Sequence, residues 1–128
     1  MAELISAPTR IPVPGGKIID EYVGRVTTGT ESVSVAHMVA PGGWSEPAQA
    51  PSFDEVTVVL RGVVRVDLIS PEGGVSTMDV PAGQAVITRA GERVRYSTGA
   101  DETEYVAVCL PAFSPETVNR DGEQETGL

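Results

Sequence analysis

The sequence predicts an all-β fold in which antiparallel strands pack as a sandwich or barrel. Apolar and polar residues alternate with a period of two over many short stretches, whereas helical periodicity is almost absent. Turn-forming residues separate these stretches, and the chain holds 14 Gly and 10 Pro. Short strands at regular spacing with turn signals between them are typical of sandwiches and barrels.

The expected strands follow one another along the chain, and each is bounded by a turn signal. Pro41-Gly42-Gly43 ends the first strand, and Gly62 lies at the turn after the second. Pro71-Glu72-Gly73-Gly74 forms a hairpin-like turn. The expected strands span residues 32–40, 55–60, 63–69, 75–80, 84–88, 93–97 and 104–110.

The ends of the chain differ from this pattern. Ser114 as N-cap and Pro115 at the first helical position predict a single helical turn. Residues 1–14 carry three prolines and are expected to form an extended arm, and the polar residues 119–128 are expected to be frayed. A length of 128 residues predicts a single domain, residues 1–128.

Composition favours a cytoplasmic protein with no nucleic-acid partner. Acidic residues outnumber basic ones 18 to 9, which gives a net charge of −9 and repels a polyanion. No apolar run approaches the roughly 20 residues that span a bilayer, so no membrane partner is expected. The N-terminus lacks a signal peptide's basic start, and the single cysteine, Cys109, can form no internal disulfide.

A frame of regularly spaced residues runs through both halves of the chain. The first half carries Gly43, Gln49, Pro51, Glu55 and Gly62, and the second carries Gly83, Arg89, Gly91, Val94 and Thr98. These spacings resemble the two motifs of the cupin family, which normally run Gly, His, His, Glu, Gly and Gly, Pro, Gly, His, Asn. The segments 44–49 and 91–96 resemble an uncharacterised bacterial branch of small single-domain cupins. The resemblance implies a cupin-type antiparallel β-sandwich or jelly-roll barrel.

The resemblance also bears on metal binding. In metal-binding cupins, three histidines and a glutamate face the barrel interior and hold a transition metal. By this resemblance Glu55 keeps the glutamate, whereas Gln49, Pro51 and Val94 replace the histidines. One carboxylate and one amide are too few ligands for a divalent ion, so neither a metal nor another cofactor is expected. The alternative is a rebuilt ligand set of Glu55, Gln49 and His37.

Three residues are candidates for acid–base catalysis. Glu55 is expected to point inward, where a carboxyl group is costly unless it is paired or protonated. His37, the only histidine, shares a strand face with valines, which places it toward the core as a proton shuttle or as a satisfied core residue. Tyr96 shares the inward face with Val94, and it could donate a proton or simply fill the barrel.

Five further residues are candidates for substrate binding. The amide of Gln49 could orient a ligand at the barrel mouth, and Glu46 lies on the same loop. Trp44 and Phe53 could stack on a ligand or close one end of the barrel. Thr57 lies on the same side of its strand as Glu55.

These residues predict a small-molecule-binding cupin that acts as a metal-independent acid–base enzyme of the isomerase, dehydratase, epimerase or cyclase type. Glu55 would be the base or acid, with His37 or Tyr96 as its complement. Two alternatives remain open. One is a non-catalytic ligand-binding or sensing cupin, and the other is a metal-dependent cupin with the rebuilt ligand set.

The strand at residues 55–60 is apolar on both faces, which predicts a homodimer. Val56, Val58 and Leu60 lie on the face opposite Glu55. Monomers rarely expose a large contiguous apolar patch, and two-fold pairing is the commonest way to cover one. The alternative is that residues 17–26 fold back over this face.

Overall fold

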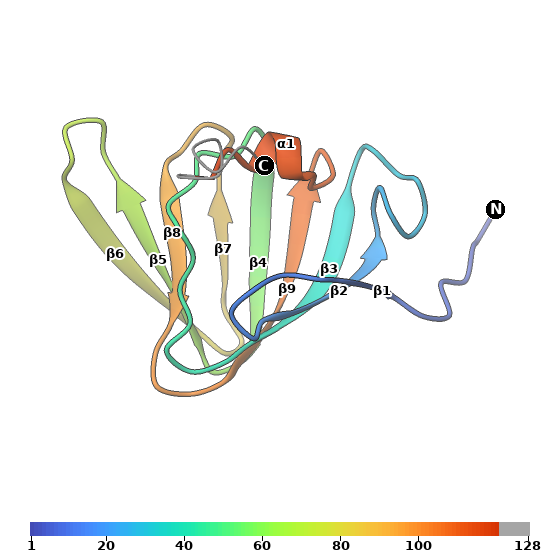
Figure 1. The fold of residues 1–128 in the computed structure, drawn as a ribbon, viewed down its shortest axis with the longest axis horizontal. Coiled ribbons are helices and arrows are strands. Elements are labelled where there is room, and N and C mark those ends of the chain that lie inside the picture. The colour runs from blue at the N-terminus through green and yellow to red at the C-terminus, as the bar shows by residue number, and fades with distance from the viewer. Residues whose placement is uncertain (121–128) are drawn as a thin grey trace.

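The computed structural model describes residues 1–120, which form nine strands and one short helix (Figure 1). The strands are β1 Thr9–Ile11, β2 Ile18–Val23, β3 Ser34–Ala40, β4 Asp54–Arg61, β5 Val63–Ile69, β6 Val75–Pro81, β7 Ala85–Thr88, β8 Val94–Thr98 and β9 Thr103–Leu110. The helix α1 spans Pro115–Val118. No helix in this part of the chain is long and apolar enough to cross a membrane.

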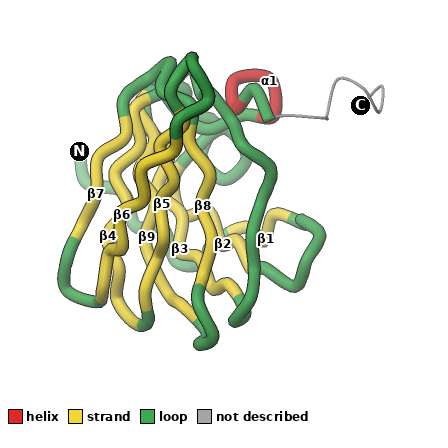
Figure 2. Tube along the Cα trace, turned by 90° about the vertical axis from the view of Figure 1, so that its left-hand side faces the viewer, coloured by secondary structure: helices red, strands yellow, loops and turns green. Residues whose placement is uncertain are grey.

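The strands form two antiparallel sheets. One has six strands in the order β1-β2-β3-β9-β4-β7, and the other has three in the order β6-β5-β8. Figure 2 shows the strands running side by side, with the connecting loops gathered at the two ends and α1 at one of them. The predicted all-β, antiparallel sandwich is therefore confirmed, and so are its seven expected strands to within a few residues at their ends.

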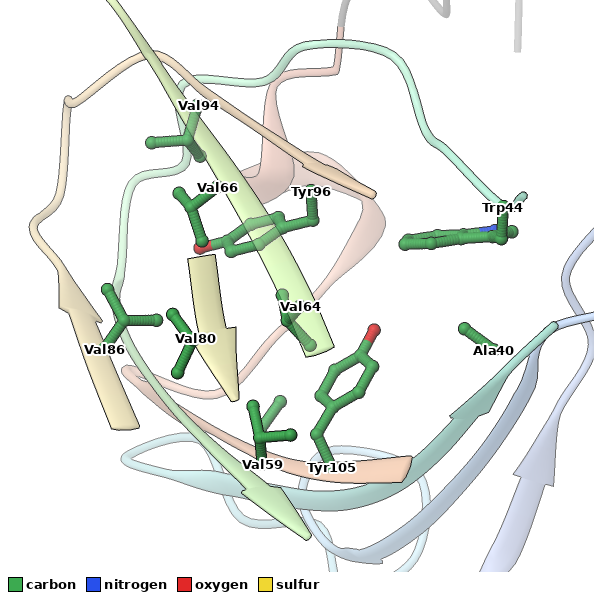
Figure 3. Close-up of a cluster of buried hydrophobic side chains, with 11 residues drawn as sticks. Ala40, Trp44, Val59, Val64, Val66, Val80, Val86, Val94, Tyr96 and Tyr105 are labelled. Atoms are coloured by element: carbon green, nitrogen blue, oxygen red, sulfur yellow. The ribbon is translucent and has the colours of Figure 1, made fainter. Parts of the chain in front are cut away.

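The core lies between the two sheets and consists mainly of valines and aromatic rings (Figure 3). Val64 and Val66 of β5 face Val59 of β4, and each is 1% exposed. Branched side chains from two facing sheets interdigitate well, which is why these short strands can form a close-packed interior. Val94, at a family histidine position, is fully buried and belongs to this core.

The N-terminal segment is more structured than the predicted arm. β1 pairs with β2, and β2 pairs with β3 through partners such as Ile18 and Val39. These strands extend the larger sheet at the edge away from β4, so they do not fold over the outer face of β4. Val58 is 37% exposed there and Leu60 is 50% exposed.

The C-terminal segment closes one end of the sandwich. α1 is the single turn that the sequence predicts, and Ser114 is its N-cap. The amide of Asn119 donates a hydrogen bond of 3.0 Å to the carbonyl oxygen of Ala50. The expectation of a frayed tail is therefore wrong for residues 119 and 120, and residues 121–128 lie outside the described residues.

Candidate functional site

A partly open pocket of about 300 Å³ lies beside the core, against the inner face of β2, β3 and β9. Its floor includes Ala36 and Ala107, which are cross-strand partners. Two alanines opposite one another leave space that larger side chains would fill. The loop that carries Gln49 and the segment around α1 form the walls. A wider groove of about 800 Å³ runs along β5 and β6, but its lining residues hold no buried ionisable group.

Glu55 on β4 is the buried carboxyl group of this pocket. It is 9% exposed and points inward as expected. Its only side-chain hydrogen bond within the described residues comes from Thr57 Oγ1, at the long distance of 3.5 Å. Burial, with a smaller contribution from nearby Glu46, raises the pKa of Glu55 to about 7. Glu55 can therefore hold or release a proton near neutral pH.

Lys17 brings a positive charge to the same pocket. It lies in the turn before β2, and its Nζ sits 4.3 Å from the ring centroid of Trp44 and 5.5 Å from that of Tyr105. A cation over aromatic faces is stabilised by the ring quadrupoles. Burial lowers the pKa of Lys17, and the charges of Glu46 and Glu55 oppose that effect.

Gln49 joins the first motif loop to the C-terminal segment. Its backbone pairs with Val94 through two hydrogen bonds of 2.8 Å, and its side chain is buried in the pocket wall. Arg120 Nε donates to Gln49 Oε1 at 3.2 Å. An Arg120 nitrogen also lies 3.7 Å from a carboxylate oxygen of Glu46, whose side chain is only 11% exposed. Glu46 thus lines the pocket rather than facing solvent.

The remaining expected binding residues are divided between the pocket and the core. Phe53 is 2% exposed, lines the pocket and packs edge to face on Phe113, with ring centroids 6.0 Å apart. Trp44 belongs to the core (Figure 3). Its ring lies below the Lys17 cation. Thr57 is fully inside the barrel and reaches the pocket only through Glu55.

His37 does not lie where the sequence predicts. It is on the outer face of the large sheet, where its Nε2 lies 2.6 Å from the carboxylate of Glu104. The prediction of an inward His37 is wrong because the inner face of β3 carries the small residues that leave room for the pocket, and the valines and His37 take the other face. His37 is therefore not a partner for Glu55.

Tyr96 points inward as expected, but it fills the core. Its hydroxyl group forms a hydrogen bond of 2.8 Å with Thr88 Oγ1, and burial raises its pKa further above the ordinary value. Tyr96 is not among the residues that line the pocket. Of the three expected catalytic residues, the structure thus brings only Glu55 to the cavity.

The residues at the family's metal position do not fit a metal ion. Pro51 and Val94 carry no donor atom, and His37 of the rebuilt set lies on the opposite face of the sheet from Glu55. Within residues 1–120, no three His, Cys, Asp or Glu side chains gather as they would around a metal. Glu55 and Gln49 remain as hydrogen-bonding groups of the pocket.

Sequence reasoning missed Lys17, Arg120 and Phe113 as pocket residues. Lys17 and Arg120 lie near the two ends of the described chain, and only the tertiary structure brings them together. The paired alanines Ala36 and Ala107 were the available signal, because small inward residues on neighbouring strands indicate a space in the barrel.

Comparison with solved structures places the chain in the cupin fold. It matches oxalate decarboxylase of Bacillus subtilis with a TM-score of 0.80 and 17% identity, over 97% of this chain and 33% of that chain. It matches the oxalate decarboxylase of Lactobacillus farciminis, in a formate complex, with a TM-score of 0.78 and 17% identity, over 97% and 37% of the two chains. At this identity the likeness shows the fold alone. No protein-family model matches the chain.

Among curated proteins, the chain is 44% identical over 112 residues to the protein named Endoribonuclease YbeY of Myxococcus xanthus (strain DK1622). The match covers 87% of this chain and 36% of the relative, so the chain spans about a third of that protein's length.

This relative overturns two sequence-based expectations. The first is a small-molecule-binding cupin, whether an acid–base enzyme, a sensor or a metal-dependent enzyme. The second is that the chain binds a small-molecule ligand and does not bind nucleic acid. Both are contradicted because the relative, 44% identical to this chain over 112 residues, is named as an endoribonuclease. The net charge of −9 describes the whole surface, and it does not exclude a local or indirect contact with RNA.

Proposed function

We propose that this chain serves in RNA processing, as a cupin-fold domain that acts together with an endoribonuclease. The observation that carries the proposal is the 44% identity to a protein named as an endoribonuclease, over most of this chain and about a third of that protein. Identity of this extent supports a shared role of the matched segment. The part of that protein that this chain does not match, roughly two thirds of its length, is long enough to form a separate catalytic domain.

The residues of the site favour a binding or positioning role over strand cleavage. Acid–base cleavage needs a base and a complementary acid, and metal-assisted cleavage needs a ligand cluster. The pocket offers Glu55 and the cation of Lys17, but Lys17 is held over the rings of Trp44 and Tyr105. His37 lies on the outer face, and Tyr96 is held by Thr88. The described residues gather no metal-ligand cluster. Cleavage is therefore assigned to the part of the relative that this chain does not match.

A chimera of the Myxococcus xanthus protein tests this proposal. The matched segment is replaced by this chain or, as a control, by the equivalent domain of Bacillus subtilis oxalate decarboxylase, which has the same fold at 17% identity. Cleavage of a labelled structured RNA is then compared with that of the native protein. The proposal predicts that this chain restores cleavage and that the control does not. Equal cleavage by both chimeras would contradict it.

We also propose that the chain assembles as a homodimer through the outer face of β4 and β7. Val58, Leu60 and Ile87 are 37%, 50% and 51% exposed on these neighbouring strands. A second copy would cover this apolar face. Arg61 lies beside it, paired with Glu102 at 2.7 Å, and could form part of a polar rim.

The proposed role also implies a cytoplasmic location, where RNA is processed. The single buried thiol of Cys109 agrees with it, because no disulfide has to form within the chain.

A further inference from the structure

We infer that this partly open pocket receives one unstacked nucleobase of a single-stranded RNA, with Glu55 and Gln49 forming hydrogen bonds to the edge of the base. The inference rests on the proposed function and names how this chain would contact RNA. Sequence-specific proteins commonly recognise RNA in this way, by splaying a base out of a single strand and holding its edge.

Gln49 and Glu55 are two buried polar residues that line the pocket. Gln49 is only 3% exposed, and its Oε1 accepts a hydrogen bond from Arg120 Nε at 3.2 Å. Glu55 is 9% exposed and has only the 3.5 Å contact with Thr57. A ligand that brings both donors and acceptors would form further hydrogen bonds with these two side chains.

The edge of a nucleobase has the chemistry that these two groups require. Every base presents donors and acceptors side by side in its plane. The amide nitrogen of Gln49 can donate to the base. The carboxyl group of Glu55 both donates and accepts when protonated, a state that its burial favours up to neutral pH. A neutral carboxyl group also avoids a fixed negative charge next to the RNA.

The walls and size of the pocket suit a planar aromatic ligand. Its volume of about 300 Å³ lies at the lower end of the range for ligand sites, which begins near 300 Å³. Phe53 and Phe113 provide aromatic surface in the pocket wall, and Ile19 of β2 and Met38 of β3 provide aliphatic surface. Aromatic side chains on which bases stack are common in proteins that bind single strands.

The charges around the pocket allow contact with only one or two phosphates. Lys17, Arg25 and Arg120 line it, together with the acidic residues Glu21, Glu46 and Glu116. Because these charges nearly balance and the chain as a whole carries −9, binding must depend mainly on the base. For single strands, one or two phosphate contacts give a slope of about −0.7 to −1.4 in log K against log salt concentration.

Fluorescence anisotropy of the full chain with an end-labelled hexaribonucleotide of mixed sequence tests the inference. The matched probe is an abasic strand of the same length and charge. Gln49→Leu removes the amide, and Ala107→Leu fills the pocket floor without changing a polar group. Gln84→Leu, at an exposed position, and Val106→Leu, on the outer face of the same strand, are the controls. Circular dichroism establishes that each variant is folded.

We expect the wild type to bind the abasic strand at least about tenfold more weakly than the mixed strand. Both pocket variants should bind the mixed strand at least about tenfold more weakly than the wild type does. A tenfold loss corresponds to one lost buried hydrogen bond or stacking contact. The two controls should bind as the wild type does, and the salt slope should stay shallow. Equal binding of the abasic strand, unchanged binding by both pocket variants, or no binding of the mixed strand would overturn the inference. The chimera experiment would then still decide the proposed function, because it does not depend on the pocket.

Discussion

Glu55 places a carboxyl group where the fold alone would favour an apolar side chain. Its neighbours on the inner face of β4, Thr57 and Val59, are each 1% exposed and are well accommodated there. Burial raises the pKa of Glu55 to about 7, and Lys17 offsets only part of that effect. A residue that makes the fold less stable at neutral pH is a reasonable candidate for a functional group.

Replacing this carboxyl group should change how stability depends on pH. An unfolded Glu55 ionises near its ordinary pKa of 4.5, whereas the folded one ionises near 7. The protonated form's contribution to the free energy of unfolding is fully present below pH 4.5 and is lost as pH rises through 7. The free energy of unfolding of the wild type therefore falls by up to about 3 kcal/mol between these values. Glu55→Gln cannot ionise and should lack this loss.

Denaturant unfolding at pH 4.5 and pH 8 measures the effect. Relative to the wild type, Glu55→Gln should gain stability at pH 8 that is absent at pH 4.5. Glu72→Gln, at an exposed turn position, should follow the wild type at both values. The same difference from wild type at both pH values in Glu55→Gln would show that Glu55 is not perturbed as described.

The sequence predicted the orientation of Glu55 correctly and that of His37 wrongly, for a physical reason. On β4 the inward side follows from the family spacing, and burial of Glu55 and Thr57 confirms it. On β3 both faces carry apolar residues, so alternation alone could not show which one was inside. The inner face holds Ala36 because a pocket lies there, and a pattern that assumes a filled core selects the other face.

At the scale of elements, the conformations of the turns explain why the spacing of the glycines predicted the fold. Gly62 between β4 and β5 has φ of +79°, and Gly83 between β6 and β7 has φ of +86°. Both are left-handed conformations that favour glycine. The two turns differ in their surroundings. A Cβ on Gly62 would lie 2.5 Å from Thr103 Oγ1, whereas one on Gly83 would meet nothing within 4 Å.

This difference predicts two unequal losses of stability. Gly83→Ala should cost about 1–2 kcal/mol, because only the backbone conformation is strained. Gly62→Ala should cost about 1–3 kcal/mol more, because the added methyl group also displaces the fully buried Thr103. Thermal unfolding of the two variants measures the gap. Equal costs would mean that the packing against Thr103 is looser than described.

The strands at the N-terminus were beyond sequence reasoning. Pro8, Pro12 and Pro14 indicated an extended arm, and β1 is only three residues long. β1 exists because it pairs with β2, and β2 forms in register with β3. Such long-range pairing leaves a weak local signal. The same holds for Arg120, whose contacts with Glu46 and Gln49 depend on the position of α1.

At the scale of the whole molecule, the exposed outer face of β4 supports the proposed homodimer. Val58→Glu would bury an unpaired charge in that contact, so the variant should be monomeric where the wild type is dimeric. Light scattering at micromolar concentration measures the mass. Val75→Glu, on β6 of the smaller sheet and 55% exposed, is the matched control and should remain dimeric. A wild-type mass of one chain would refute the dimer.

The proposed role in RNA processing could not be predicted from composition or motifs. A net charge of −9 argues against a polyanionic partner, and the cupin spacing specifies a fold that serves many functions. Only kinship with a longer protein brought RNA into consideration. If the RNA contact is confined to one buried base, as we infer, no basic stripe is needed for it.

Photo-crosslinking tests the central claim most directly. The full chain is irradiated with a single-stranded RNA that carries a photoreactive base, and the crosslinked peptides are identified by mass spectrometry. We expect crosslinks at pocket residues such as Phe53, Phe113 and Met38, and their loss in Ala107→Leu. An absence of crosslinks above those of an unrelated acidic protein, or crosslinks confined to the outer face of β4 and β7, would contradict it.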